Sequence, residues 1–295
     1  MISRQASIVR ASIVPETIDA GWTLESERSD WENAVKSDRL AAGTTERDDT
    51  VAGRRVLWIA PDGVLATDAI MVYVHRGGLT AGSLSTHRAF ASRLAAGSGL
   101  QLLLVDYQLL PDSAFPAPLD DVVSVIDELV SSGRSVPNRI VLAGDSNGAA
   151  LAFSAACVLR DQNVGALAGI VSLSGAFDAT LSGDSIDADR DPQLSRLVLE
   201  HWQRTVSVAV DPRDPLMSPL FAALHDLPPS LLLCGGDDVW LSDSLRLAEK
   251  LAAAGNSVLL DVVGSMWHVW PMHGEFPEAD AAISQVAAFV NRVTC

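Results

Sequence analysis

The stretch with the clearest chemical potential is a glycine-flanked serine, Gly144-Asp145-Ser146-Asn147-Gly148. In a G-x-S-x-G pattern the serine occupies a sharp turn between a strand and a helix, which exposes its hydroxyl group. The glycines are needed because a Cβ atom at either position would crowd that turn. Residues before the motif are apolar like a short buried strand, and those after it are apolar on all sides like a buried helix. This context predicts that Ser146 is a nucleophile.

A second Gly-Asp-Ser sequence, at residues 183–185, provides an internal comparison. It continues Ile186-Asp187, so it has neither an apolar strand before it nor a glycine after it. We therefore interpret this second copy as part of a loop.

A serine hydroxyl becomes a good nucleophile only when a base removes its proton, and histidine is the usual base. Of the six histidines, His268 and His273 follow a late strand and a possible acid. His268 comes first, after a short loop that would carry it over the carboxyl edge of a sheet, so we favour it over His273. For His273, His87, His201 and His225 the simpler expectation is an ordinary surface histidine.

The base in turn needs an orienting carboxylate, which should leave the end of the preceding strand. The apolar run at residues 231–234 continues through two glycines directly to Asp237 and Asp238. Residue type alone leaves both aspartates open, and a solvated pair of loop residues is the plain alternative for each.

Backbone N–H donors are also required, because an acyl-transfer reaction develops negative charge on an oxygen atom. One donor is expected from Asn147. Others are expected from Gly77 and Gly78, in a turn that follows the apolar run at residues 70–74. We expect His75, at the start of this turn, to clamp the loop and not to act as an acid or base.

Short apolar runs alternate with helical patterns from residue 55 onward, and this alternation must position the candidate residues. It predicts an α/β fold with a mostly parallel sheet covered by helices on both faces. The expected strands are 56–60, 70–74, 102–105, 140–143, 170–173, 231–234 and 258–263. The expected helices are 85–96, 119–131, 146–159, 242–254 and 279–293.

Two segments fall outside this alternation. Residues 1–50 are polar, with helices expected near 15–20 and across 24–42, and we interpret them as cap helices. Residues 177–223 interrupt residues 51–295, the expected catalytic domain, with Asp-rich loops and a short amphipathic piece at 194–202. We expect this insertion to form a lid together with the N-terminal helices.

Composition narrows the possible partners. With 295 residues the chain can bury a large core, and its net charge of -16 argues against nucleic acid or anionic membrane. Its three scattered cysteines, with Cys157 and Cys234 in apolar runs and Cys295 at the terminus, favour a reduced, cytoplasmic protein. No signal-peptide core and no run of 18 apolar residues is present, so no membrane span is expected.

Taken together, the motifs resemble those of the hormone-sensitive-lipase-like family of bacterial esterases, which has the α/β-hydrolase fold. The resemblance extends from about residue 50 to the end. In chain order, the matching stretches are His75-Arg-Gly-Gly78, Asp106-Tyr-Gln-Leu-Leu-Pro111, Phe115-Pro-Ala117, Gly144-Asp-Ser-Asn-Gly148, Ser218-Pro-Leu220, Asp237-Asp-Val-Trp-Leu-Ser-Asp243 and Trp267-His268.

The resemblance implies a catalytic triad of Ser146, His268 and Asp237, with Asp237 preferred over its neighbour on this ground. It also implies oxyanion donors at Gly77, Gly78 and Asn147, and a cap formed by N-terminal helices. The chain departs from the family pattern at Arg76 and Ala149, where the family has glycine, and at Gln108, where it has arginine.

Three residues near these motifs are candidates for substrate binding. Arg76 stands where its side chain could reach the mouth of the acyl site, and we hypothesise that it contacts substrate. Trp240 and Trp267 flank the proposed acid and base, as does Trp270, and could line a pocket, although packing is the simpler role for at least one of them.

The resulting expectation is a serine carboxylic-ester hydrolase that acts on small to medium acyl esters, such as a lactone or an acetylated metabolite. It would form an acyl-enzyme, and it would need no cofactor or metal. The alternatives are acyl transfer, cyclisation or amide cleavage with the same triad, and a non-catalytic receptor for a small ligand. The sequence leaves both a monomer and a homodimer open.

Overall fold

The structure is a computed structural model that describes residues 2–64, 69–206 and 210–295. Its centre is an eight-stranded sheet with the order β1-β2-β4-β3-β5-β6-β7-β8. Strands β3 to β8 run parallel, and β2 pairs antiparallel with both β1 and β4. The strands are β1 (Thr44–Val51), β2 (Arg54–Pro61), β3 (Ile70–Val74), β4 (Gln101–Val105), β5 (Ile140–Asp145), β6 (Gly169–Leu173), β7 (Ser230–Gly235) and β8 (Val258–Val263).

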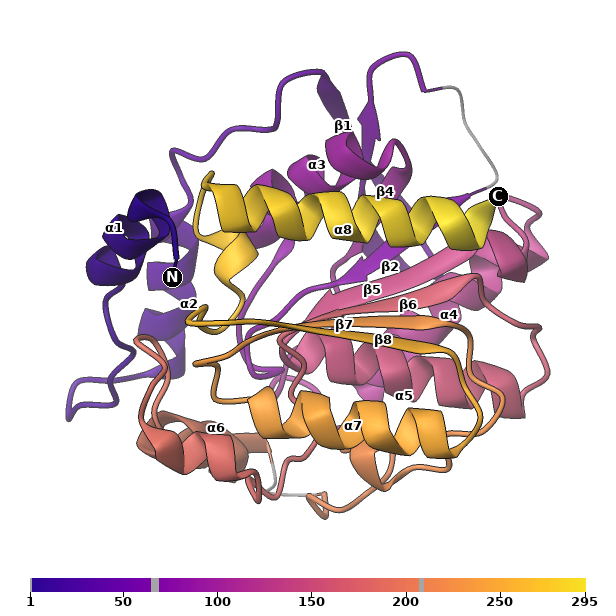
Figure 1. Cartoon of the computed structure of the whole chain (residues 1–295). Helices are drawn as coiled ribbons and strands as arrows, with labels where there is room; N and C mark the ends of the chain where they lie inside the picture. The colour runs from indigo at the N-terminus through magenta and orange to yellow at the C-terminus, as the bar shows by residue number, and fades with distance from the viewer. Residues whose placement is uncertain (1, 65–68, 207–209) are drawn as a thin grey trace.

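Helices cover both faces of the sheet, as predicted (Figure 1). One face carries α3 (Leu84–Ser98) and α8 (Pro277–Thr294), whose apolar residues form one continuous core with the strands. The other face carries helices that enclose a second core. These are α4 (Ala117–Ser131), α5 (Asn147–Asp161) and α7 (Leu241–Ala253). Short 3₁₀ turns lie at Pro137–Arg139, Asp184–Ala188, Pro219–Phe221 and Trp270–Met272.

Strand β1 was not predicted from the sequence. Its residues, TTERDDTV, are almost all polar, and most of them are exposed. An edge strand with solvent on one side and along one border needs little apolar patterning, because backbone hydrogen bonds to its partner strand hold it in place. The pairing runs from Thr44 opposite Pro61 to Val51 opposite Arg54.

The remaining helices, α1 (Arg4–Ser12), α2 (Leu24–Ala34) and α6 (Arg196–Val206), gather at one end of the sheet (Figure 1). The helix predicted near residues 15–20 is wrong, because those residues are not helical. The first helix, α1, lies before them and ends at Ser12, and Ser3 caps its start by accepting a hydrogen bond from the Ala6 N–H group. Helix α2 ends before the predicted residue 42. Residues 207–209 of the expected lid insertion lie outside the described residues.

Within the described residues, no helix combines the length and the apolar character needed to cross a lipid bilayer. Cys157 and Cys234 are buried and Cys295 is exposed, and all three are free thiols.

Candidate active site

Ser146 occupies the predicted sharp turn, between the end of β5 and the start of α5. Its backbone has φ 52° and ψ -125°, a combination that costs energy for a residue with a side chain. The flanking glycines make the turn possible. A Cβ atom on Gly144 would lie 2.6 Å from the carbonyl carbon of Gly148, and one on Gly148 would lie 2.2 Å from the carbonyl oxygen of Val74.

His268 lies beyond β8 and contacts the carboxylate of Asp238, with 3.2 Å between its Nδ1 atom and Oδ1. Both side chains are almost completely buried. Burial disfavours the charged form of Asp238, but the neighbouring His268 and several hydrogen bonds hold the pKa of this carboxyl below its usual value. One of those bonds comes from the backbone N–H of Trp240, at 2.9 Å. A buried carboxylate against Nδ1 fixes the ring orientation and supports a positive charge on it.

The expectation that Asp237 would orient His268 is therefore corrected to Asp238. The carboxylate of Asp237 instead forms an ion pair with Arg10, at 3.0 Å from Nη1. Successive side chains leave an extended turn in different directions, so only one of two adjacent aspartates can face the histidine. Arg10 also donates to the carbonyl oxygens of Ser265 and Arg190, at 2.8 Å each.

A second carboxylate, Asp191, supports the histidine from the insertion. Its Oδ2 atom accepts the backbone N–H of His268 at 2.8 Å. Its Oδ1 atom accepts the N–H groups of Gln193 and Leu194. Burial, followed by the charge of Asp238, raises the pKa of Asp191 to about 6. The sequence offered no signal for this residue, because it is one of several aspartates in a polar loop.

Ser174, at the end of β6, connects the loops that carry the other site residues. Its hydroxyl oxygen accepts the Val269 N–H at 2.9 Å, and its own N–H donates to the Leu233 carbonyl at 2.8 Å. Two residues later, the Ala176 N–H donates to the Ser146 carbonyl at 3.2 Å. The ends of β5, β6 and β7 are thereby tied to the histidine loop.

The loop after β3 has the backbone geometry expected of an oxyanion cradle. Gly77 and Gly78 adopt φ values of 128° and 60°, and a Cβ atom on Gly77 would lie 2.1 Å from the Ala81 carbonyl oxygen. Among the described residues, the N–H groups of Gly77, Gly78 and Asn147 have no hydrogen-bond acceptor. Three backbone donors are thus left free to stabilise an oxyanion.

His75 holds this loop in place, in keeping with its expected role as a clamp. Its ring stacks on Tyr107 with centroids 4.2 Å apart, and its Nδ1 atom lies 2.8 Å from the Arg76 carbonyl oxygen. The Tyr107 hydroxyl donates to the His75 carbonyl at 2.8 Å. Burial lowers the pKa of His75 to about 3, so the ring is neutral at physiological pH.

A small apolar cavity of about 40 Å³ adjoins the free donors at Gly78 and Asn147. Trp240 lines this cavity, as proposed from the sequence. Trp202 on α6 also lines it, and its ring would lie 3.4 Å from a Cβ atom on Gly78. Sequence reasoning missed Trp202, because only the fold brings the insertion over the oxyanion loop. Leu199, Val206 and Met217 complete much of the wall.

The proposed role of Trp267 in substrate binding is corrected, because the ring lies in the core and not at the surface of the site. The side chain is fully buried in the core beneath α8, where it stacks on Phe276. Its Nε1 atom donates to His273 at 3.1 Å. Trp270 is likewise fully buried. Both rings support the histidine loop from the core side.

Behind Ser146 lies the buried carboxylate of Asp145. It accepts hydrogen bonds from the Tyr73 hydroxyl at 2.9 Å and from the Arg76 N–H at 3.1 Å. The Nε atom of Arg76 and the Nε2 atom of His87 each lie 3.7 Å from Oδ2 of Asp145. The expectation of a surface position for His87 is thus wrong, because the ring is buried as part of this cluster.

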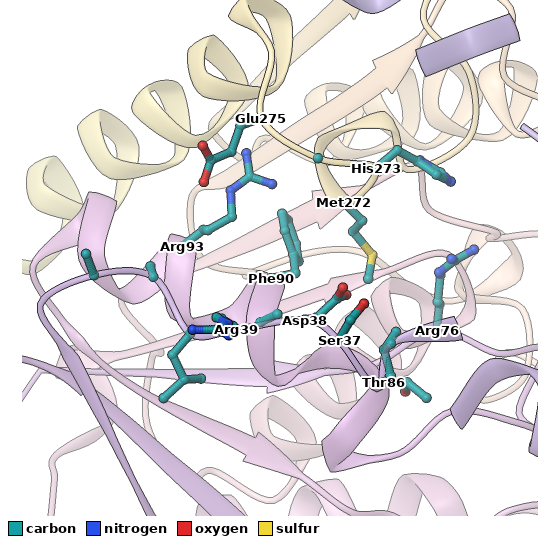
Figure 2. Close-up of a pocket in the computed structure, with 16 residues that line it drawn as sticks. Ser37, Asp38, Arg39, Arg76, Thr86, Phe90, Arg93, Met272, His273 and Glu275 are labelled. Carbon is teal, nitrogen blue, oxygen red and sulfur yellow. The ribbon is translucent and has the colours of Figure 1, made fainter. Parts of the chain in front are cut away.

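Arg76 extends from the oxyanion loop into a second, more polar region. It lines a cavity of about 290 Å³ together with Glu16, Trp31 and Gln193. It also lines a neighbouring cavity of about 650 Å³, where Figure 2 shows it beside Met272 and across from Arg93 and Glu275.

Comparisons with known proteins identify the family to which the chain belongs. A family model described as alpha/beta hydrolase fold matches residues 71–272. An esterase of Acinetobacter venetianus is 33% identical over 224 residues, covering 75% of this chain and 74% of the relative. An acetyl-hydrolase of Streptomyces hygroscopicus is 34% identical, covering 76% of each chain.

Solved esterase structures superpose on the chain over almost its whole length. An esterase from the bacterial hormone-sensitive lipase family superposes with a TM-score of 0.92 at 31% identity, covering 100% of both chains. The esterase EstE5, in a crystal soaked with p-nitrophenyl butyrate, superposes with a TM-score of 0.90 at 30% identity. That match covers 99% of this chain and 97% of EstE5.

Proposed function

Because the chain belongs to the α/β-hydrolase family and is a carboxylesterase-type hydrolase of the hormone-sensitive lipase group, we propose that it cleaves short acyl esters through Ser146, His268 and Asp238. The observation that carries this proposal is the buried contact between Asp238 and His268 at the sheet edge that also holds the Ser146 turn. A strained serine, a carboxylate-oriented histidine and unused backbone donors are the parts that nucleophilic acyl chemistry requires.

In the proposed reaction, Ser146 attacks the ester carbonyl while His268 takes its proton. The resulting oxyanion accepts hydrogen bonds from Gly77, Gly78 and Asn147, and each such donor is worth on the order of 10² to 10³ in rate. His268 then protonates the leaving alcohol, and the acyl group remains on Ser146. Water, activated by the same histidine, releases the acid. Asp238 supports the imidazolium in both steps.

The cavity beside the oxyanion donors defines the acyl group in this proposal. Its volume of about 40 Å³ leaves room for only a short chain beyond the carbonyl before Trp202 and Trp240 are met. We therefore assign acetyl and similarly short acyl esters as the substrate class. Two of the relatives are an esterase and an acetyl-hydrolase, and both names are compatible with this class.

The test is hydrolysis of p-nitrophenyl esters from C2 to C12, with labelling by a fluorophosphonate. We expect the wild type to favour C2 to C4 and to be labelled on Ser146. Ser146→Ala should lose labelling and retain only the residual rate that binding and the oxyanion donors supply. Full activity in Ser146→Ala would refute the proposal, and adding alcohol or amine acceptors would reveal acyl transfer in place of hydrolysis.

A further inference from the structure

Two separate compartments adjoin the loop after β3, one lined by Gly78 and the other by Arg76, and the geometry indicates which part of an ester each one receives. The leaving alcohol must lie on the side of the group that protonates it, here His268. The cavity of about 290 Å³ lies on that side, because it is lined by Met272, in the turn after His268, and by Gln193, next to the Asp191 loop. The small cavity at Asn147 lies on the oxyanion side. The alcohol compartment is therefore the larger and more polar of the two.

Arg76 contributes a positive charge to the alcohol compartment, and two neighbouring side chains fix its position. Its Nε atom lies 3.7 Å from Asp145, and its guanidinium carbon lies 4.8 Å from the centre of the Trp31 ring. The side chain is only 15% exposed. A guanidinium held between a carboxylate and an indole face has lost most of its rotational freedom before any ligand arrives.

The terminal nitrogens of Arg76 have no hydrogen-bond partner among the residues that the structure describes. Glu16 lines the same cavity but already accepts the Gln193 side-chain amide, at 2.8 Å. Burial also raises the pKa of Glu16, which weakens it as a counter-ion for Arg76. Arg76 thus presents a pre-oriented pair of N–H donors to the cavity.

We propose that Arg76 binds a carboxylate carried by the alcohol part of the ester, so that the preferred substrates are short acyl esters of hydroxy acids. This inference rests on the proposed ester hydrolysis and adds the identity of the leaving group. A guanidinium and a carboxylate match in planarity and form two parallel hydrogen bonds, which a neutral amide does not reproduce. Arg76 is one of the two positions, with Ala149, at which the chain departs from a glycine of the related family.

The experiment compares two acetates that differ only in charge, 4-acetoxybenzoate and 4-acetoxybenzamide. Each kcat/KM is divided by the rate of hydroxide-catalysed hydrolysis, which removes the difference in intrinsic reactivity. We expect the wild type to favour the benzoate by about 10- to 100-fold, the range for a charge-assisted hydrogen bond. In Arg76→Gln this preference should disappear, and in Arg76→Lys it should be partly retained.

The ratio is the readout because loss of the partner of Asp145 is expected to slow both reactions together. Arg39→Gln is the matched control, because Arg39 lines only the neighbouring cavity of about 650 Å³, and its substitution should leave the ratio unchanged. If Arg76→Gln does not fold, product inhibition of the wild-type enzyme provides the test of the inference. Product 4-hydroxybenzoate should inhibit amide-substrate turnover at least 10-fold more strongly than 4-hydroxybenzamide does.

Other outcomes overturn the inference in distinguishable ways. Equal corrected rates in the wild type would show that charge on the alcohol is not recognised. If the wild type preferred 4-(ammoniomethyl)phenyl acetate and Glu16→Gln lost this preference, the alcohol compartment would bind cationic and not anionic leaving groups. If the wild type cleaved none of these acetates, the proposed ester hydrolysis itself would be rejected.

Discussion

The Nδ1 atom of His268 lies 3.2 Å from Oδ1 of Asp238, whereas the adjacent Asp237 pairs with Arg10 on the first helix. Replacing either aspartate by asparagine should therefore have very different effects. Asp238→Asn is expected to lower kcat by about 10⁴, because the amide favours the wrong tautomer of the histidine. Asp237→Asn, which removes the same charge one residue away, should keep kcat within about tenfold of wild type. Kinetics on p-nitrophenyl acetate distinguishes them, and a reversed order would restore Asp237 as the catalytic acid.

Arg10 is expected to act on catalysis without touching substrate. It joins α1 to Asp237, to the Ser265 carbonyl and to the Arg190 carbonyl, so it holds together the loops that carry Asp238 and His268. Arg10→Gln should reduce kcat by roughly tenfold with little change in KM, because small displacements of catalytic groups are costly. Arg10→Lys should recover part of this loss, and Arg4→Gln, an exposed position on the same helix, is the control. A loss confined to KM would instead place Arg10 in substrate binding.

Trp202 is expected to limit the length of the acyl chain. Its ring closes the cavity beside Gly78 and Asn147, so Trp202→Ala should open that cavity into the space beneath α6. We expect the preferred p-nitrophenyl ester to lengthen from C2–C4 to C6–C8, with a reduced rate on acetate. Leu197→Ala, at an exposed residue of the same helix, should leave the chain-length profile unchanged. An unchanged profile in Trp202→Ala would mean that the acyl chain lies elsewhere.

Glu27 on α2 gives a prediction for stability as a function of pH. Both oxygens of its carboxyl group are buried and lack a hydrogen bond within the described residues. Burial, followed by the charge of Glu16, raises the pKa of Glu27 from 4.5 to about 7. A raised pKa means that the folded state holds its proton more tightly than the unfolded state. Stability from this group is therefore complete below about pH 4.5 and is lost as the pH rises through 7.

Glu27→Gln should accordingly be more stable than wild type at pH 8, by about 1–3 kcal/mol after allowance for partial solvent screening. At pH 4 the two proteins should unfold at nearly the same temperature. Thermal unfolding followed by circular dichroism between pH 4 and 8.5 measures the difference. Glu25→Gln, at an exposed position on the same helix, should show no such trend, and a benefit that did not grow with pH would contradict the account.

The features that follow from local patterns were predictable from the sequence. Continuous apolar runs specify the parallel strands, and the glycines around Ser146 specify the turn, because only small residues fit there. The choice between Asp237 and Asp238 was not predictable, because it depends on which side chain turns toward the histidine. That direction is set by the turn after β7 and by the docking of Arg10, some 230 residues earlier in the sequence.

The position of a tryptophan relative to a cleft is equally a property of the assembled fold. Trp240 and Trp267 both flank the proposed acid and base in sequence, yet one lines the small cavity beside Asn147 and the other lies in the core beneath α8. Strand β1 was not predicted for a related reason. Its residues are polar, and it forms a strand because it pairs with β2.

The contacts of α1 also have a consequence for the order in which the molecule folds. Ser3 binds Glu278 and Arg10 binds Ser265, so these contacts join residues that are 275 and 255 positions apart in the sequence. Closing a loop of this length costs conformational entropy before the contact stabilises the fold. We therefore expect α1 to dock late in folding, after the sheet has formed.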